Sequence, residues 1–446
     1  MLRPTPGECV AFWTGERVVR RHLVVLLLLT PLSVPDVFAD VIGRMTPAEA
    51  LTSARVATLP ERDRAPWLEY LERSRQRMAA DKGALTAERV GLANVPDSPP
   101  TGSWASKALE ADAAWYGSAE ARRIADNIVS FQTPTGGWGK NQDRTGPTRV
   151  RGQQLAVNER LPANARSGIP GDDDWAYVGT IDNDATIVEL RFLAKVQQTL
   201  PGADGDPYRA AALKGLRYLL EAQYPNGGWP QVYPLAGGYH DAMTFNDNAL
   251  ANVAEFLTAV ATRQDECAFV PTDVAADAGR AVSRALEVVT QAQVVVGATR
   301  TGWGQQHDPL TLRPVGARNY EPAALSSTES AAMLSFLMRV PTPSPAVVRA
   351  VHAGVAWLKT RGLRDIEWRQ GASPGDGRRA MPKPGAGPLW ARIYDITTMR
   401  PIFGDRDRTI HDDVNDISLE RRNGYAWYST APAKTIRQYE AWAVRH

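Results

Sequence analysis

The feature that most restricts the fold of this chain is a short signature that occurs twice. It reads Gln-x-Pro-x-Gly-Gly-Trp at residues 132–138 and again at residues 223–229. Apolar side chains recur at helical spacing before each copy, and a degenerate third copy ends at Gly302-Trp303. Residues 348–358 indicate the helix of a fourth copy. A helix that is followed several times by the same turn is typical of repeat architectures, so we predict a mainly α-helical fold of repeated helix pairs.

A second repeated feature follows each signature, at the expected start of the next helix. It is a run of acidic and amide residues: Asp182-Asn183-Asp184, then Asn246-Asp247-Asn248, with a weaker third run at Ser327-Thr328-Glu329. One such side chain is enough to cap a helix, so N-capping explains only part of the pattern. Carboxylate and amide oxygens are also the ligands that calcium prefers. We therefore predict that at least one run faces a shared cleft, and we assign the acidic residues 172–174 to a solvated loop.

The segment from Gly302 to Pro322 has the highest density of chemically active side chains. Its prolines and glycines exclude a helix, and a loop between scaffold helices is where binding and catalytic groups are often placed. The segment carries His307, Arg313 and Arg318. Arginine forks bind carboxylates in a bidentate manner, so two arginines in this setting predict an acidic ligand.

Composition and motifs set several function classes aside. With 446 residues and a net charge of only +2, the chain lacks the basic stripe that is typical of nucleic-acid-binding proteins. It has no Gly-x-Ser-x-Gly elbow, no His-Glu-x-x-His and no phosphate-binding loop. We therefore predict no nucleic-acid partner, and the ligand must be inferred from the site residues.

Residues 1–39 have the pattern of an export signal. Two arginines at residues 20–21 precede a short apolar run, and residues 37–39, Val-Phe-Ala, form a small-residue cleavage site. The apolar run is too short to span a bilayer. We therefore predict a secreted or periplasmic protein with no stable membrane insertion after the signal is removed. Because Cys9 would leave with the signal, Cys267 would have no partner for an internal disulfide.

Downstream of the signal, we divide the chain into two parts. Residues 40–104 are rich in charge and alanine and predict a helical extension that packs on the repeats. Residues 105–446 hold the repeats and the candidate site, so we predict that they form the catalytic domain. Their aromatic and arginine-rich end, residues 389–442, predicts a small irregular, strand-containing C-terminal segment. We expect the protein to be a monomer.

Taken together, the motifs resemble the pectate lyases of polysaccharide lyase family 10. The resemblance extends from about residue 105 to residue 445. It rests on both signature copies with Thr180-Ile-Asp-Asn, Phe245-Asn-Asp-Asn-Ala, Val315-Gly-Ala-Arg-x-Tyr-Glu-Pro and Leu389-Trp-Ala-Arg-x-Tyr-Asp. Members of that family fold as an (α/α) toroid and cleave α-1,4-linked polygalacturonate by calcium-assisted β-elimination, which gives 4,5-unsaturated oligogalacturonides. The resemblance therefore implies a toroid, a polygalacturonate substrate and Ca2+ as cofactor.

The resemblance also implies roles for individual residues. Asp182, Asn183 and Asp247 are the expected calcium ligands, and Asp182 is also expected to be catalytic. Arg318 is the expected base and Arg313 its rival, since the sequence does not rank the two. A guanidinium ordinarily stays protonated in proteins, so an arginine base requires surroundings that favour the neutral form or an immediate transfer of its proton. The side chains that we expect to bind substrate are Arg313, Arg392, Lys140, Trp229, Tyr239 and His307.

Three other functions stay open at the level of the sequence. The glutamine-tryptophan turns also resemble those of triterpene cyclases, but a cyclase needs an aromatic-lined apolar cavity, and aromatic residues make up only 8% of the chain. A glycoside hydrolase would use a general acid and a second carboxylate. An exported carbohydrate-binding protein would stack sugars on exposed aromatic side chains, although a tryptophan in such a turn serves equally well as a structural plug. The stacking candidates are Trp138, Trp229, Trp303 and Tyr239.

Overall fold

The structure is a computed structural model, and it describes most of the chain after the predicted signal. The described residues are 41–104, 108–157, 175, 177–200 and 202–446. The predicted signal peptide at residues 1–39 and the predicted solvated loop at residues 172–174 lie outside the described residues. Among the described residues, no helix has the length and apolar character needed to cross a bilayer.

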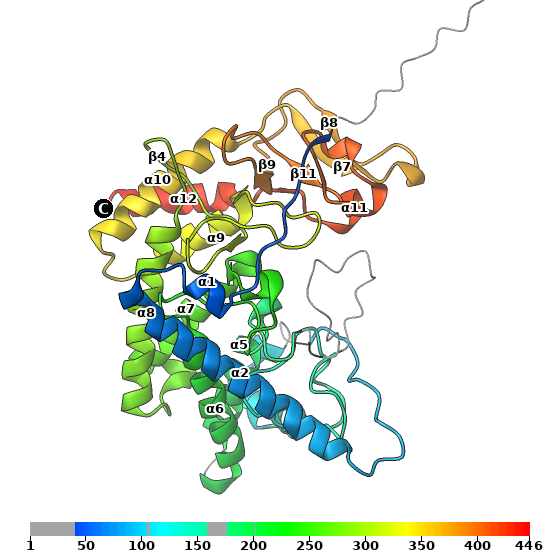
Figure 1. The fold of residues 1–446 in the computed structure, drawn as a ribbon, viewed down its shortest axis with the longest axis vertical. Helices are drawn as coiled ribbons and strands as arrows, with labels where there is room; N and C mark the ends of the chain where they lie inside the picture. The colour runs from blue at the N-terminus through cyan, green and yellow to red at the C-terminus, as the bar shows by residue number, and fades with distance from the viewer. Residues whose placement is uncertain (1–40, 105–107, 158–174, 176, 201) are drawn as a thin grey trace, which may run out of the picture. The chain divides into compact units, whose positions relative to one another are not determined.

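Two layers of helices form the framework, which confirms the prediction of a mainly α-helical fold of repeated helix pairs (Figure 1). The outer layer comprises α4 (Ala119–Ser130), α6 (Asp206–Ala222), α8 (Thr272–Ala292) and α10 (Pro345–Arg361), and the inner layer comprises α5 (Ile187–Thr199), α7 (Ala249–Thr262) and α9 (Ser327–Leu337). Neighbours contact each other in chain order within each layer, and each inner helix also packs on the outer helix that follows it. The inner helices are buried over a larger share of their residues. This is the arrangement of an (α/α) toroid.

The glutamine of the signature joins each repeat to the next. Its side-chain amide donates one hydrogen bond to a carbonyl within its own turn and a second to a carbonyl in the following outer helix. The inter-repeat bonds run from Gln132 to Ala211 (2.9 Å), from Gln223 to Ala281 (2.8 Å) and from Gln293 to Ala350 (2.9 Å). The spacing of the signature therefore reflects the step from one helix pair to the next.

The tryptophan of the signature is a structural plug. Trp138, Trp229 and Trp303 have no exposed surface, and each indole N–H donates to a carbonyl of the preceding outer helix. A side chain without exposed surface cannot stack on a sugar, so the structure assigns Trp229 to packing in place of the predicted substrate contact. Trp390 makes the same bond to the Leu358 carbonyl of α10 at 2.8 Å, and it marks the fourth repeat without a signature around it.

The extension after the predicted signal packs on the repeats. It contains β1 (Val41–Arg44), α1 (Ser53–Val56) and the long α2 (Glu61–Arg89). The Tyr70 hydroxyl in α2 donates to the Ala222 carbonyl at the end of α6 (2.9 Å), and Arg77 pairs with Glu221. In addition, β1 pairs with a strand close to the C-terminus.

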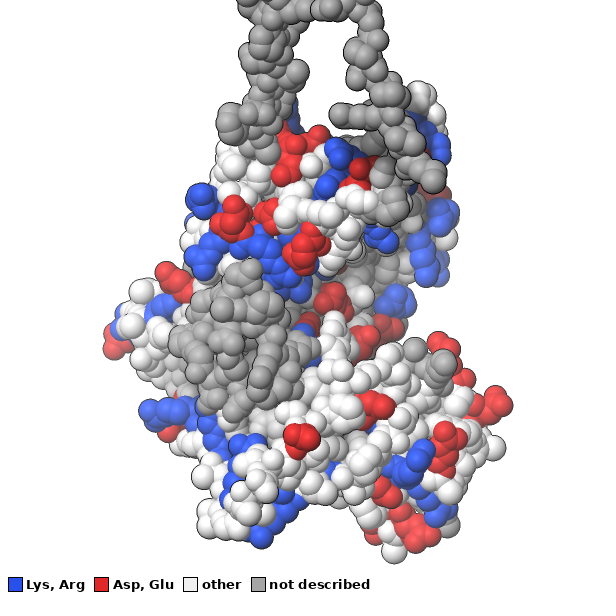
Figure 2. Space-filling model, turned by 90° about the vertical axis from the view of Figure 1, so that its right-hand side faces the viewer, with Lys and Arg blue, Asp and Glu red and all other residues white. Residues whose placement is uncertain are grey.

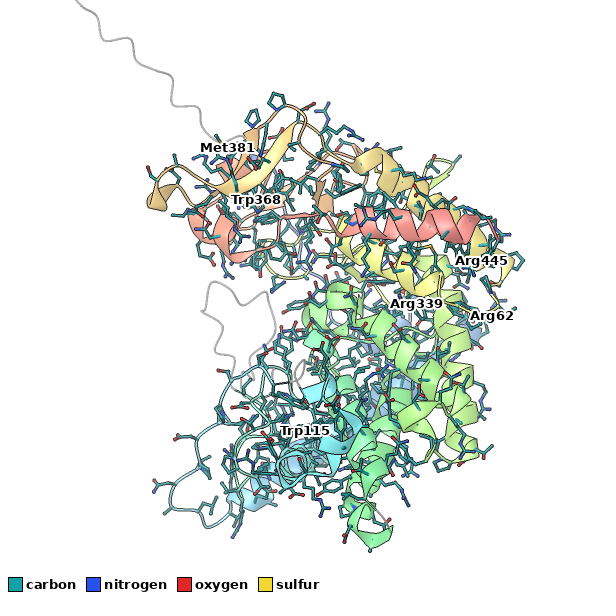
Figure 3. The ribbon with its side chains drawn as sticks, turned by 180° about the vertical axis from the view of Figure 1, so that it is seen from behind. Arg62, Trp115, Arg339, Trp368, Met381 and Arg445 are labelled. Carbon is teal, nitrogen blue, oxygen red and sulfur yellow. The ribbon has the colours of Figure 1, made fainter. Side chains whose placement is uncertain are left out.

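Short strand pairs connect the loops and the C-terminal segment, as predicted for that segment. The pairs are β2 (Met243–Thr244) with β5 (Gln306–His307), β3 (Val295–Val296) with β4 (Thr299–Arg300), β6 (Leu325–Ser326) with β10 (Ile393–Tyr394), β7 (Ile366–Gln370) with β8 (Arg378–Pro382), and β9 (Trp390–Ala391) with β13 (Tyr428–Ser429). A three-stranded sheet has β12 (Thr409–His411) in its middle, between β1 and β11 (Phe403–Gly404). Figure 3 labels Trp368 and Met381 on the β7–β8 hairpin.

Two helices make the C-terminal segment more regular than predicted. They are α11 (Leu419–Gly424) and α12 (Ala431–Ala443), and α12 packs on α9 and α10.

On the face drawn in Figure 2, acidic and basic side chains are interspersed around a hollow.

We expect Gln223→Ala to lower the free energy of unfolding by about 3 kcal/mol, because the carbonyls of Gly227 and Ala281 would each lose a buried donor. Equilibrium unfolding in urea measures this. The matched control is Gln76→Ala, which removes an amide that donates to Glu72 on the exposed side of α2 and should change the free energy by less than about 0.5 kcal/mol. Equal losses in the two variants would contradict the role given to the signature glutamine.

Candidate active site

The two acidic runs form matching 3-10 turns in front of inner helices. The turns are η4 (Asp182–Asp184) before α5 and η7 (Asn246–Asn248) before α7, and they contact each other. Their middle residues have left-handed backbone, with φ of 50° at Asn183 and 49° at Asp247, a conformation that Asn and Asp tolerate better than most L-residues. Helix α5 is capped instead by Thr186, in a capping box with Glu189. The first acidic run, Asp182–Asp184, is therefore not needed as a cap for α5, and its side-chain oxygens are available for another purpose.

Asp182 is a buried carboxylate with one used and one unused oxygen. Its Oδ2 accepts a hydrogen bond from Lys140 Nζ at 2.7 Å, and that ammonium also lies 3.6 Å from the centre of the Tyr177 ring. Its Oδ1 is buried and has no hydrogen-bond partner among the described residues. Burial opposes the charge of Asp182, but Lys140 outweighs burial and holds the pKa of the carboxyl below its usual value. The carboxylate is therefore ionised and keeps one free oxygen.

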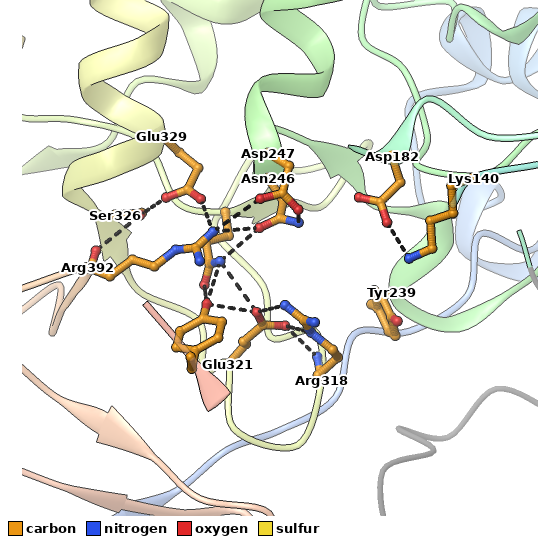
Figure 4. Close-up of polar contacts among 12 residues, drawn as sticks. Lys140, Asp182, Tyr239, Asn246, Asp247, Arg318, Glu321, Ser326, Glu329 and Arg392 are labelled. Carbon is orange, nitrogen blue, oxygen red and sulfur yellow. Dashed lines mark hydrogen bonds and ion pairs between the residues drawn. The ribbon is translucent and has the colours of Figure 1, made fainter. Parts of the chain in front are cut away.

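Arg392 lies beside the second acidic turn. Its Nη2 donates to Asn246 Oδ1 (3.0 Å) and to Glu329, and it lies 3.7 Å from Asp247 Oδ1 (Figure 4). The guanidinium also stacks over the Tyr425 ring, 4.7 Å from its centre. Partial burial, and then the charge of the nearby Asp182, raise the pKa of Asp247. The Asp247 side chain is 42% exposed, so this carboxylate is within reach of a ligand.

Arg318 and Glu321 form an ion pair on the opposite side of the cluster (Figure 4). The Nε of Arg318 donates to Glu321 Oε2 at 2.7 Å, and its Nη2 donates to Oε1. Glu321 is buried and also accepts from the Tyr425 hydroxyl at 2.8 Å. Burial opposes the charge on Arg318, but Glu321 outweighs it and raises the pKa of the guanidinium well above its usual value. With its side chain one third exposed, Arg318 is a cation that a ligand can contact.

Tyr239 and His307, two predicted substrate contacts, are largely or fully buried. Tyr239 is 3% exposed, and its hydroxyl lies 2.9 Å from that of Tyr177. The Tyr239 side chain lies near Lys140 in Figure 4. His307 has no exposed surface: its Nε2 accepts from the Gly304 N–H, its Nδ1 bonds to a backbone carbonyl, and burial lowers its pKa to about 4. The structure therefore assigns His307 to holding its loop rather than to the predicted contact.

The two rival arginines of the loop are in different surroundings. Arg318 belongs to the cluster, whereas Arg313 is exposed in a turn, where its carbonyl accepts from the Asp308 N–H. No contact seen among the described residues joins the Arg313 guanidinium to the carboxylates of the cluster. The geometry thus favours Arg318 for any chemical role, and the sequence alone did not rank them.

The structure adds residues that the sequence analysis did not select. Glu329 comes from the weaker third run, and Glu321 follows Arg318 within the same motif, so both had a signal in the sequence. Gln305 lies in the segment from Gly302 to Pro322 but was given no role, and Tyr425 was not selected as a site residue. Gln305 Nε2 donates to Asn246 Oδ1 (3.1 Å) and to the Tyr425 hydroxyl (2.9 Å), which connects the two halves of the cluster.

The donor set of the cluster fits a calcium ion that shares its coordination with a ligand. Among the described residues, no group of three His, Cys, Asp or Glu side chains is arranged to hold a metal by itself. Asp182 nevertheless offers a buried oxygen without a partner, and Asp247 offers an accessible carboxylate. Calcium takes six to eight oxygens and accepts carboxylates, amides and water, so two protein carboxylates leave room for oxygens of a bound anion.

The charge balance of the cluster points the same way. Four carboxylates face three cationic side chains, so an anionic ligand would meet a net negative site unless a cation were present. The carboxylates are Asp182, Asp247, Glu321 and Glu329, and the cations are Lys140, Arg318 and Arg392.

Comparisons with known proteins agree with this arrangement. The family model described as pectic acid lyase matches residues 132–436. A family 10 polysaccharide lyase from Cellvibrio cellulosa is 31% identical, with a TM-score of 0.62 over 76% of this chain and 95% of that chain. An aspartate-to-alanine mutant of a family 10 polysaccharide lyase from the same organism, in complex with trigalacturonic acid, is 31% identical, with a TM-score of 0.61 over 74% and 95% of the two chains. No curated protein sequence matches the chain significantly.

Proposed function

The chain belongs to the pectic acid lyases of polysaccharide lyase family 10 and is a pectate lyase, and we propose that its active site is the cluster around Asp182, Asp247, Arg318 and Arg392. The observation that carries this proposal is the clustering of two guanidinium groups with Asp182, which has a buried oxygen without a partner among the described residues, and with the accessible carboxylate of Asp247. The related enzyme bound to trigalacturonic acid supports an α-1,4-linked polygalacturonate as the substrate.

The reaction is a β-elimination at the uronate residue whose C4 oxygen leaves. The C5–H bond breaks, its electron pair forms the C4–C5 double bond, and the C4–O bond breaks with its electron pair remaining on the glycosidic oxygen, which then takes up a proton. Negative charge builds on the carboxylate next to C5 while the proton leaves. The exposure of Arg318, one third of its side chain, supports a role for it at that carboxylate or at C5, and cationic donors that stabilise developing charge usually give the largest catalytic effect.

We propose that Arg318 removes the C5 proton after passing its own proton to Glu321. The two groups share two side-chain hydrogen bonds, so a proton moved from the guanidinium to Glu321 leaves a neutral guanidine, which can act as a base. Glu321 holds the pKa of Arg318 high, so the neutral pair is a minor state. A bound divalent cation nearby would favour it, because it destabilises the guanidinium charge. Glu321 is thus a positioning residue and a proton acceptor for Arg318.

We propose that Asp182 and Asp247, with the side-chain oxygen of Asn183, hold the Ca2+ ion. The Nδ2 of Asn183 donates to Asn141 Oδ1 at 3.1 Å, which orients the amide and leaves its oxygen for a ligand. When bound, calcium supplies a Lewis acid that neutralises the uronate carboxylate. Lys140 keeps Asp182 ionised, and Arg392 keeps Glu329 paired and clear of the metal ligands.

We also propose that the enzyme acts outside the cytoplasm. Polygalacturonate is a polymer that an intact membrane excludes, and the sequence pattern of residues 1–39 supports export. Residues 40–104 are proposed to be an extension that stabilises the repeats, residues 105–446 to be the catalytic domain, and the enzyme to be a monomer.

A product assay distinguishes the candidate functions. With polygalacturonate and calcium, we expect the ultraviolet absorbance of a conjugated double bond to rise in step with new reducing ends, because elimination creates both. A glycoside hydrolase would raise reducing ends without that absorbance. A non-catalytic binding protein would raise neither, and either of these two results would contradict the proposed function.

A further inference from the structure

A second groove lined with arginines lies outside the active site. It has a volume of about 720 Å³ and is bounded by the β3–β4 hairpin, one face of α10 and the turn at Met399. That volume is in the usual range of binding sites for small ligands. The groove shares no lining residue with the cluster of Asp182, Asp247, Arg318 and Arg392.

The charge of this groove is positive and uncompensated. Arg300, Arg349 and Arg361 line it, the lining includes no Asp or Glu, and none of the three forms an ion pair with a described residue. Two of them are held in place by backbone carbonyls: Arg300 Nη1 donates to Thr290 (3.0 Å) and Arg361 Nη1 donates to Met399 (2.8 Å). Three arginines around one hollow whose lining has no acidic residue favour an anionic ligand.

The floor of the groove is one face of α10. Arg349, Ala353, Ala356 and Thr360 follow one another at spacings of three and four, so they form one stripe along α10. Arg349 and Arg361 are twelve residues apart on this helix, which corresponds to about 18 Å. A single small anion would not span Arg349 and Arg361, whereas a chain with carboxylates at regular intervals would reach both.

A buried donor lies in the wall of the same groove. Trp357 lines the groove, packs edge-on against Tyr394, and its indole N–H has no acceptor among the described residues. The indole N–H groups of the signature tryptophans and of Trp390 all have acceptors, whereas that of Trp357 has none among the described residues. This N–H is buried, so the charged groups of the groove that a ligand can contact are the three arginines.

We propose that this groove is a second, non-catalytic binding site for a polyuronate chain. It holds the polymer on the enzyme through the carboxylates of successive uronate residues, while the small alanine side chains of α10 allow the chain to lie close to the helix. The choice of polyuronate as the ligand rests on the proposed function; the anionic character of the ligand rests on the groove alone.

The test compares two variants that remove the same amount of charge. Arg300→Gln with Arg349→Gln empties the groove of two cations, and the matched control Arg122→Gln with Arg123→Gln removes two exposed arginines of α4. Binding is measured by affinity electrophoresis in gels that contain polygalacturonate, with EGTA present so that turnover does not interfere. We expect the groove variant to bind roughly five- to tenfold more weakly than wild type, as for the loss of two exposed ion pairs, and the control to be unchanged.

Kinetics give the second readout. In the groove variant, KM for the polymer should rise while its kcat stays as in wild type. Both kcat and KM for trigalacturonate should also be unchanged, because the trimer lacks the further uronate residues that would occupy a second site. Equal binding by both variants, an equal loss in both, or no retardation of wild type would each overturn the proposal. These results can be told apart from a failure of the proposed function. If wild type forms unsaturated products and the groove variant binds the polymer as tightly as wild type, only the second site is rejected. If the groove variant binds more weakly but wild type forms no unsaturated products, only the lyase activity is rejected.

Discussion

Replacing Arg318 with alanine should lower kcat on polygalacturonate by about 10²- to 10⁴-fold, the usual contribution of a positioned base. Arg318 is the accessible guanidinium of the cluster, and its contact with Glu321 provides the acceptor for its proton. Initial rates of ultraviolet-absorbing product, measured at saturating substrate and calcium, give the change. Arg313→Ala is the matched control from the same loop and should keep kcat within about twofold of wild type, because Arg313 is exposed and outside the cluster.

The fold of this variant needs its own check, since Arg318→Ala leaves Glu321 buried without its cation, which typically costs about 3–5 kcal/mol. The Tyr425 hydroxyl bond to Glu321 remains and offsets part of this cost. Arg318→Lys keeps the positive charge and so keeps the fold, but a lysine lacks the bidentate fork and should also be inactive. If Arg318→Ala kept most activity while Arg313→Ala lost it, the base would be Arg313 and the role of Glu321 would be wrong.

The second large effect is expected for Asp182→Asn, with kcat at a fixed calcium concentration lower by about 10²-fold or more. The substitution preserves size but removes the charge of the carboxylate whose Oδ1 is without a partner. The calcium concentration for half-maximal rate should therefore rise at least about tenfold, because a neutral amide binds calcium less tightly than a carboxylate. A calcium titration of initial rates measures both quantities.

Asp184→Asn is the matched control, because Asp184 lies in the same turn but accepts a hydrogen bond from Asn252. It should leave the calcium dependence close to that of wild type. Asp182→Asn also deprives the buried Lys140 of its counter-charge, so rates must be compared below the lower of the two Tm values. An unchanged calcium dependence in Asp182→Asn, with the protein folded, would remove Asp182 from the metal site.

The repeat architecture was predictable because its determinants are local. Each signature places a glutamine, two glycines and a tryptophan within seven residues, and the bonds of Gln132 and Trp138 show why that spacing recurs. The acidic runs were predictable for the same reason: they stand directly before α5 and α7, and the contact of η4 with η7 then brings Asp182 and Asp247 to one place.

The rest of the site depends on contacts between distant segments, which a single sequence does not reveal. Tyr425 lies more than one hundred positions after Glu321, and only the packing of the C-terminal segment brings its hydroxyl to that carboxylate. Burial was the other unknown. Trp229 and His307 carry side chains that suit ligand binding, and the structure uses both to hold turns.

One cluster of carboxylates and guanidinium groups is proposed to remove a proton from pectate with the help of calcium. The most direct measurement is the rate of ultraviolet-absorbing product from polygalacturonate, first with wild-type enzyme in excess EGTA and then after calcium is added beyond the chelator. We expect no product in EGTA and full recovery on addition of calcium. Full activity in EGTA, or chain cleavage without the unsaturated product, would contradict it.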